Sequence, residues 1–140
     1  MHLAAQLAAS ALLMVVMTLV HALGVLGIAR GLRLDRRHEP RGRLRPATVA
    51  ILGTVALLLF GLHMAEIALF AAFYLAIGAF SGIEEALFVS ASSYATLAQP
   101  EQSFPLEWRL VGAIEGLVGF LLIGWSTAFF VTDMNKLLRE

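Results

Sequence analysis

Three long apolar stretches, separated by two more polar segments, dominate the pattern of the chain. Residues 3–28 contain no Asp, Glu, Lys or Arg, residues 47–80 contain only Glu66, and residues 110–132 contain only Glu115. A helix needs about 20 predominantly apolar residues to cross the hydrocarbon core of a bilayer. The pattern therefore predicts an all-α membrane protein with three transmembrane helices.

The expected ends of the spans follow from the same pattern. The second span is longer than a bilayer requires, so it is expected to tilt or to protrude. A break is expected at residues 78–82, which read GAFSG. The predicted spans run from Leu3 to about Ile28, from about Ala47 to as far as Ile77, and from near Leu106 or Glu107 to near Met134.

A short helix is predicted at residues 83–94, between the second and third spans. Ser81 is the expected N-cap, and Glu84 and Glu85 lie in the first turn, where carboxylates interact favourably with the helix dipole. About three turns cover only half a membrane. Two interpretations remain open on the local pattern: a re-entrant pore helix followed by a filter-like loop, or a surface helix followed by an external loop.

Basic side chains concentrate between the first two spans. Seven arginines lie from Arg30 to Arg45, against one Asp and one Glu, although the net charge of the chain is zero. A segment of this kind either binds nucleic acid or marks the cytoplasmic side of a membrane, and its position between two spans favours the second interpretation. Together with Lys136 and Arg139, it predicts a multi-pass protein of the inner (plasma) membrane, with the N-terminus outside and the C-terminus in the cytoplasm.

The composition narrows the function classes. Of the 140 residues, 59% are hydrophobic and 14% are charged, which is too little polar surface for a soluble domain. The N-terminal stretch MHLAAQLAAS lacks the basic region of a signal peptide, so the first span is expected to stay in the mature protein. The sequence has no cysteine, no Gly-rich phosphate loop and no H-E-x-x-H motif. We therefore expect neither an enzyme nor a resident cofactor.

The order of these segments resembles the pore module of tetrameric potassium channels. In that family a spanning helix precedes a half-length pore helix, a filter of the type T-V-G-Y-G-D or T-L-G-Y-G-D, and an inner helix that often opens with Trp and Arg. In this chain ALFVSASSYATLAQPE takes the place of the pore helix and filter, and WRLV at residues 108–111 opens the inner helix. HMAEIALFAAFYL and GFLLIGWSTAFFVTD are similar to segments of small bacterial two-pore-domain-like channels.

The resemblance covers about residues 51–134 and implies a subunit of a homotetrameric cation channel in a lipid bilayer, with K⁺ or Na⁺ as the permeant ion. It divides the chain into an N-terminal helix with the basic loop, residues 1–46, and a pore module, residues 47–140. Nucleic acid is not an expected partner. The implied site residues are Thr96, Leu97, Ala98, Gln99, Pro100 and Glu101 in the filter, with Gly119 at the hinge position and Thr127 at a cavity-lining position of the inner helix.

The filter departs from the family pattern at the residues that carry selectivity. Ala98 and Pro100 stand in place of glycines, whose left-handed backbone angles cost Ala energy and are forbidden to Pro. Gln99 lacks the aromatic ring that packs a filter against its pore helix. A ring of Thr96 oxygens and a ring of Glu101 carboxylates at the outer mouth remain, and these predict a cation pore with weak discrimination between K⁺ and Na⁺.

Two other functions compete with the conducting channel subunit. The first is a non-conducting membrane protein that is derived from the channel fold and has a structural or regulatory role. The second is a small transporter, but the sequence lacks the paired broken helices that inverted repeats produce.

Ionisable side chains inside the spans are functional candidates because they are expensive in a bilayer. Glu115 is expected to brace the filter loop, to line the pore, or to be protonated and bonded to a neighbouring helix. His63 and Glu66 are neighbours on one helix face, and a pair that satisfies itself or Glu115 is preferred to a metal site, since two ligands are too few. His21 is expected to pack or to face lipid, and the small residues of G-A-I-E-G at 112–116 predict close packing of the inner helix on the pore helix.

The charge pattern yields a prediction on topology. Reporter fusions at Arg41 and after Glu140 should both report the cytoplasm, because basic segments resist translocation. Reporters on opposite sides would eliminate the three-span arrangement and, with it, the re-entrant segment.

Overall fold

The computed structural model describes residues 3–35, 46–97 and 104–139. These residues form four helices and no strand: α1 (Leu3–Asp35), α2 (Pro46–Ala76), α3 (Ile83–Tyr94) and α4 (Arg109–Arg139). Within them, Leu3–Gly31, Val49–Ala76 and Arg109–Asn135 are long and apolar enough to cross a membrane. The all-helical class and the three candidate spans are therefore confirmed.

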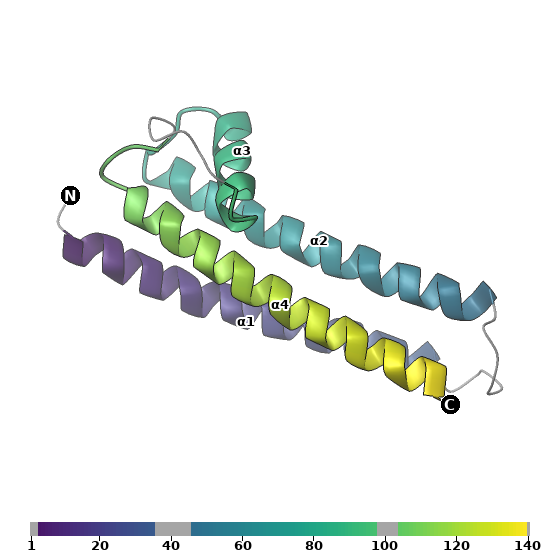
Figure 1. The fold of residues 1–140 in the computed structure, drawn as a ribbon. Helices are drawn as coiled ribbons and strands as arrows, with labels where there is room; N and C mark the ends of the chain where they lie inside the picture. The colour runs from purple at the N-terminus through teal and green to yellow at the C-terminus, as the bar shows by residue number, and fades with distance from the viewer. Residues whose placement is uncertain (1–2, 36–45, 98–103, 140) are drawn as a thin grey trace.

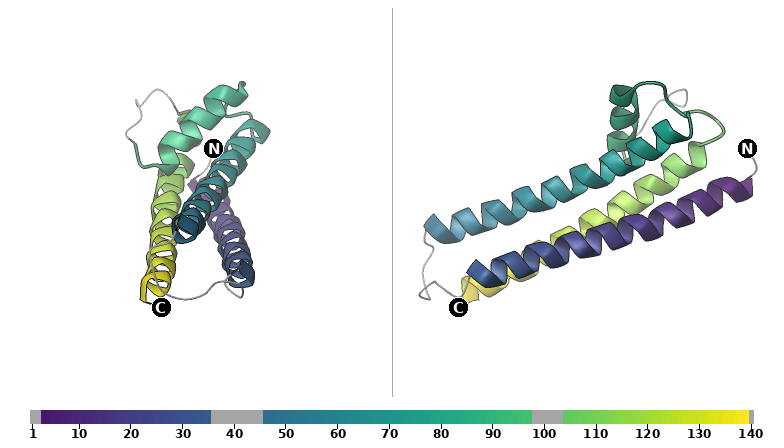
Figure 2. Two further views of the ribbon diagram at one scale, coloured as in Figure 1. Left: turned by 90° about the vertical axis from the view of Figure 1, so that its right-hand side faces the viewer. Right: turned by 180° about the vertical axis from the view of Figure 1, so that it is seen from behind.

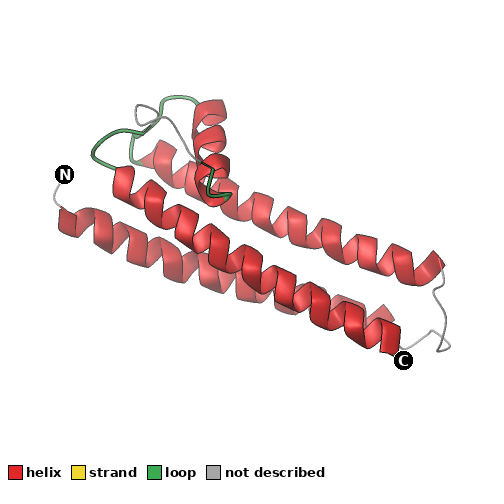
Figure 3. Cartoon of the chain, in the orientation of Figure 1, coloured by secondary structure: helices red, strands yellow, loops and turns green. Residues whose placement is uncertain are grey.

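The three long helices lie side by side in an elongated bundle (Figures 1 and 2). α1 and α4 run in one direction and α2 runs against them, so the end of α1, the start of α2 and the end of α4 lie at the same end of the bundle. α1 packs on α2 and α4, and α3 packs on the same two helices. The described loops gather around α3 at the opposite end (Figure 3). The two basic segments thus adjoin the same end of the bundle.

The long helices extend a little beyond their predicted limits. α1 continues past Ile28 to Asp35, and α4 continues past Met134 to Arg139. The added residues are mainly Leu, Arg and Lys, which are good helix formers, and they include no proline. α2 begins at Pro46, one residue earlier than predicted. Proline is favoured at this first helical position because its missing N–H has no helical partner there in any case.

The third span starts later than predicted. Residues 106–107 precede α4, which begins at Arg109. Pro105 opens a turn that the Trp108 N–H closes by donating to the Pro105 carbonyl at 2.9 Å. The turn, rather than the helix, therefore contains Glu107.

The break between α2 and α3 falls where the glycines predicted it. Gly78 adopts a φ of +70°, and the N–H groups of Gly78 and Ala79 donate back to carbonyls of α2, which closes the helix in a Schellman motif. Ser81 is not the N-cap, contrary to the prediction. Gly82 holds that position in an extended conformation, without a side-chain cap, while residues 84–85 supply the acidic first turn as expected. The extended backbone before α3 places Ser81 one residue too early to cap it.

The short helix α3 has 12 residues, with the predicted bounds, and its C-terminal end packs against α2 and α4. Tyr94 packs on Gly119 of α4 and donates a hydrogen bond to Glu66 of α2. Each of these two residues is ten positions from the near end of its helix, or about 15 Å along the axis at 1.5 Å per residue. α3 therefore runs from one end of the bundle to about a third of the length of the 31-residue helices α2 and α4.

Apolar side chains cover both the interior and the outside of the bundle. The core surrounds α3 and includes Phe70, Tyr74, Val89, Tyr94 and Val118. Many large apolar side chains are exposed along the long helices, among them Leu12, Leu57, Phe60 and Phe120. Exposed apolar area on this scale is typical of surfaces that face lipid or other protein chains.

The approach of α3 to α4 yields a prediction on stability. A Cβ at Gly119 would collide with the backbone carbonyl of Tyr94, whereas a Cβ at Gly124 would meet nothing within 4 Å. Gly119→Ala should therefore lower the free energy of unfolding by about 1–3 kcal/mol, as overpacking usually does. Gly124→Ala should leave it unchanged or raise it by up to about 1 kcal/mol. Denaturation of both variants in the same detergent checks this, and equal stabilities would refute the close contact.

Candidate functional site

The predicted filter begins where α3 ends. Thr96 and Leu97 directly follow the helix, and both are exposed. Within the described part of the chain, therefore, the site begins with these two residues, about a third of the way along the bundle. The other four predicted filter residues lie outside the described residues: Ala98, Gln99, Pro100 and Glu101.

Thr96 has a left-handed backbone with φ +56°, which is unusual for a β-branched residue. Its N–H donates to the Ser93 carbonyl, and the Leu97 N–H donates to the Ser92 carbonyl, both at 2.9 Å. These bonds form a Schellman motif, whose left-handed position is normally glycine. Thr at this position costs about 1–2 kcal/mol. Strained residues of this kind cluster at functional sites, so Thr96 is a candidate on backbone geometry as well as on sequence.

A hollow of about 450 Å³ opens between the end of α3 and α4. Arg109 at the start of α4 is among its lining residues. The glycines of α4 allow the approach, because a Cβ at Gly116 would lie only 2.9 Å from the Ser93 carbonyl oxygen. The close packing that was predicted for residues 112–116 is therefore present. The walls of the hollow include Ser93, Thr96, Leu97, Gly116, Leu117 and Phe120.

Glu115 is fully buried and connects three helices. The Tyr74 hydroxyl of α2 donates to its Oε2 atom at 2.6 Å, and the Ser90 hydroxyl of α3 lies 2.5 Å from its Oε1 atom. The carboxyl group thus holds α3 against α2 and α4. Because this side chain is fully buried, it does not line a surface of the single chain. Its described bonds go to the neighbouring helices α2 and α3, so it braces α3, while bracing of the filter loop itself stays a prediction.

The face of α4 that carries Glu115 points into the bundle. Gly119, Leu122 and Ser126 share this face and are all buried. Thr127, by contrast, is exposed and bonds only to a carbonyl of its own helix among the described contacts. Gly119 is therefore a packing position, and Thr127 lies on an outward side of α4.

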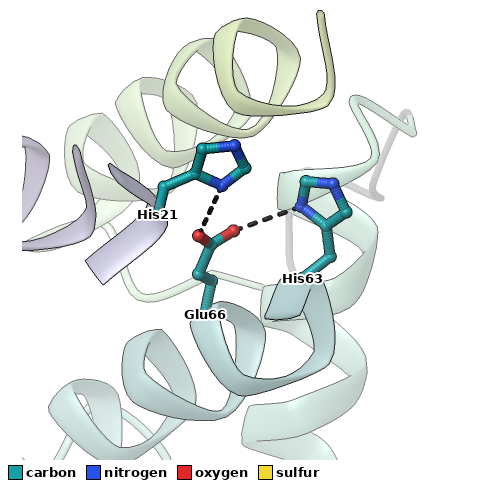
Figure 4. A group of neighbouring side chains, drawn as sticks. All are labelled: His21, His63 and Glu66. Atoms are coloured by element: carbon teal, nitrogen blue, oxygen red, sulfur yellow. Dashed lines mark hydrogen bonds and ion pairs between the residues drawn. The ribbon is translucent and has the colours of Figure 1, made fainter. Parts of the chain in front are cut away.

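A second polar cluster surrounds Glu66 at the middle of the bundle (Figure 4). The His21 Nδ1 of α1 lies 2.8 Å from Glu66 Oε1, and the His63 Nδ1 lies 3.2 Å from Glu66 Oε2. Tyr94 also donates to Oε2, and its oxygen lies 2.8 Å from His63 Nδ1. The second nitrogen of His21 lies 3.4 Å from Ser126 Oγ of α4. All four helices contribute to this cluster.

His21 has a partner that the sequence did not predict. It was expected to pack or to face lipid; it packs inside the bundle with 0% exposure, and it is also bonded to Glu66. The expected pair of His63 and Glu66 is present, and His21 makes it a group of three. The only sequence signal was a histidine inside an uncharged span, which by itself names no partner.

The comparisons with known proteins do not assign a family. No protein-family model, no curated protein and no solved structure matches the chain. The resemblance to potassium-channel pore modules therefore rests on the sequence segments quoted above. The site has to be interpreted from its own geometry.

The burial of Glu115 yields a prediction with an internal control. Glu115→Leu leaves the Tyr74 hydroxyl without its carboxyl partner, at about 1–3 kcal/mol for a buried group left unpaired, whereas Ser90 keeps its bond to the Ile67 carbonyl at 2.9 Å. We expect a lower unfolding midpoint in detergent and less assembled protein. Glu107→Leu, in the exposed turn before α4, should change neither.

A double variant separates lost hydrogen bonds from altered packing. Adding Tyr74→Phe to Glu115→Leu removes the unpaired hydroxyl and should recover part of the lost stability. Equal tolerance of Glu115→Leu and Glu107→Leu would contradict the bracing role.

Proposed function

We propose that this chain is one subunit of a homotetrameric cation channel, with residues 47–140 as its pore module. The observation that carries the proposal is the position of α3, a 12-residue helix whose C-terminal end reaches about a third of the way along α2 and α4, roughly 15 Å from their near ends. Non-helical backbone at membrane depth is tolerated only where protein buries it or where it lines a water-filled cavity. A re-entrant helix that leads to a pore meets this condition.

The polarity of α3 favours cations over anions at this depth. Helix C-termini carry a partial negative charge, and the last turn, residues 91–94, contains no Lys or Arg to compensate it. Thr96 and Leu97 follow at once and line the hollow beside α4. Hydroxyl and carbonyl oxygens at this position are the groups that replace the water around a permeating cation.

A pore requires several copies, because one chain supplies one half-helix and one filter-like segment. α4 presents exposed apolar side chains beside the hollow, including Leu117 and Phe120. These are available to pack against neighbouring subunits around a common axis. The number four comes from the resemblance to potassium channels, and α1 is an addition to the minimal two-helix pore of that family.

The proposed pore selects weakly between K⁺ and Na⁺. Ala98 and Pro100 do not support the glycine backbone angles of a potassium filter. The Thr96 and Glu101 rings that remain concentrate cations without a ladder of carbonyl sites.

Reconstitution tests the proposal in two steps. Mass measurement of the full chain in detergent should give a tetramer. Liposomes that contain it should show cation flux, and their reversal potential should stay close to zero under opposed K⁺ and Na⁺ gradients.

Each contrary result contradicts a different part. A monomer in detergent and in liposomes would refute the channel assembly. A silent tetramer would favour the non-conducting alternative, in which the fold serves as a structural or regulatory subunit. Strong K⁺ selectivity would refute the argument from Ala98 and Pro100.

A further inference from the structure

The cluster around Glu66 contains more metal-ligating groups than a buried carboxylate needs for hydrogen bonding. His21, His63 and Glu66 each offer a ligand atom, and these atoms lie within 4.8 Å of one another. Tyr94 brings its hydroxyl oxygen to the same point. Figure 4 shows both imidazole rings beside the carboxylate, each joined by a dashed line to one of its two oxygens. The group is therefore four potential ligands around one centre, from α1, α2 and α3.

We propose that this cluster binds a divalent transition-metal ion, with Zn²⁺ as the best match. The ligands are the Nδ1 atoms of His21 and His63, the carboxylate of Glu66, and the hydroxyl oxygen of Tyr94 in the fourth position. Two imidazoles and one carboxylate form a known protein ligand set for zinc. Mg²⁺ and Ca²⁺ prefer oxygen ligands, so a site with two imidazole nitrogens is a poor match for either ion.

The distances require only a small adjustment on binding. Ligand atoms in a tetrahedral zinc site with bonds of about 2.1 Å lie about 3.4 Å apart. His21 Nδ1 is 2.8 Å from one carboxylate oxygen, and His63 Nδ1 is 3.2 Å from the other. The metal replaces these hydrogen bonds, and each imidazole proton moves from Nδ1 to Nε2. The ligand atoms of His21, His63 and Glu66 lie within 4.8 Å of one another, so the widest pair has to close to about 3.4 Å.

The surroundings already contain an outer partner for one ligand. Metal-binding histidines usually donate their other N–H to a polar group that fixes the ring. His21 Nε2 lies 3.4 Å from Ser126 Oγ, so Ser126 is placed to accept a hydrogen bond from this N–H. The side chain of His63 is 16% exposed, against 0% for Glu66, so the ion reaches the site along the His63 side.

A bound ion would connect α1 to the end of α3. His21 is the only ligand from α1, and Tyr94 lies two residues before Thr96. The ion would thus fix the helix end from which the filter-like segment starts. Metal binding itself does not depend on conduction, so its test is independent of the proposed channel function.

Metal titration of the full chain tests the site directly. The protein, purified in detergent with a tag that contains no histidine and then stripped of metal, should bind about one Zn²⁺ per chain in competition with a chromophoric chelator. Its unfolding midpoint should rise on addition of Zn²⁺, because a ligand of the native state stabilises it. Co²⁺ should give the intense visible absorption of a four-coordinate ion, which needs no variant to interpret.

Variants assign the ligands. His63→Gln and Glu66→Gln should each weaken Zn²⁺ binding by more than about 100-fold, beyond the effect usual for outer partners. Ser126→Ala, a small change, should weaken it by about 10-fold. His38→Gln and Glu107→Gln replace a histidine and a glutamate that are not among the proposed ligands and should have no effect. Gel filtration confirms that each variant remains folded.

Two outcomes would overturn the proposal. The first is a wild-type chain that gives only the pale spectrum of hydrated Co²⁺ and no midpoint shift with Zn²⁺, which would make the cluster a hydrogen-bond network alone. The second is binding that survives in His63→Gln and Glu66→Gln but is lost in His38→Gln, which would place the ion elsewhere in the chain.

Discussion

Hydrogen bonds to two buried carboxyl groups hold the short helix α3 inside the bundle, and the rest of the site depends on them. Glu115 bonds to Tyr74 and Ser90, and Glu66 bonds to Tyr94 and to α1. Each carboxyl group therefore links α3 to other helices. Apolar packing alone specifies weakly how far one helix is shifted along another, because shifted positions bury similar apolar side chains. A buried polar group without its partner is costly, so the native register is the one that pairs them all.

These bonds require that α3 approach α4 very closely, and two glycines of α4 permit it. Gly116 lies under the Ser93 carbonyl and Gly119 under Tyr94, with no room for a Cβ at either position. Small residues at a helix interface allow backbones to come together where side-chain hydrogen bonds then form. The close packing of α3 on α4 and the hydrogen bonds to the two carboxyl groups thus depend on each other. The glycines determine how near α3 lies, and the carboxyl groups determine its position along α4.

The helices could be predicted because the apolar residues and glycines that define a helix lie within that helix or at its ends. Apolar length gave the three spans, and the glycines at 78–82 gave the break before α3. The partners of the buried groups could not be predicted in this way. His21 and Glu66 are 45 residues apart, and nothing near His21 in the sequence refers to Glu66. The left-handed backbone of Thr96 could not be predicted either, but here the local sequence points the wrong way. A β-branched residue disfavours this conformation, and the end of α3 imposes it nevertheless.

The two clusters restrict which parts of the chain move at low cost. Ser90 and Tyr94 are four residues apart, so they lie on one face of α3 and engage both carboxyl groups at once. Displacing α3 along its axis would break both sets of bonds together and leave several buried polar atoms unpaired. Low-energy motion is therefore confined to segments outside these contacts. Within the described chain, the outward-facing residues of α4 beyond Ser126 and the residues that follow α3 satisfy this condition, so a gate in this fold would involve them and not α3.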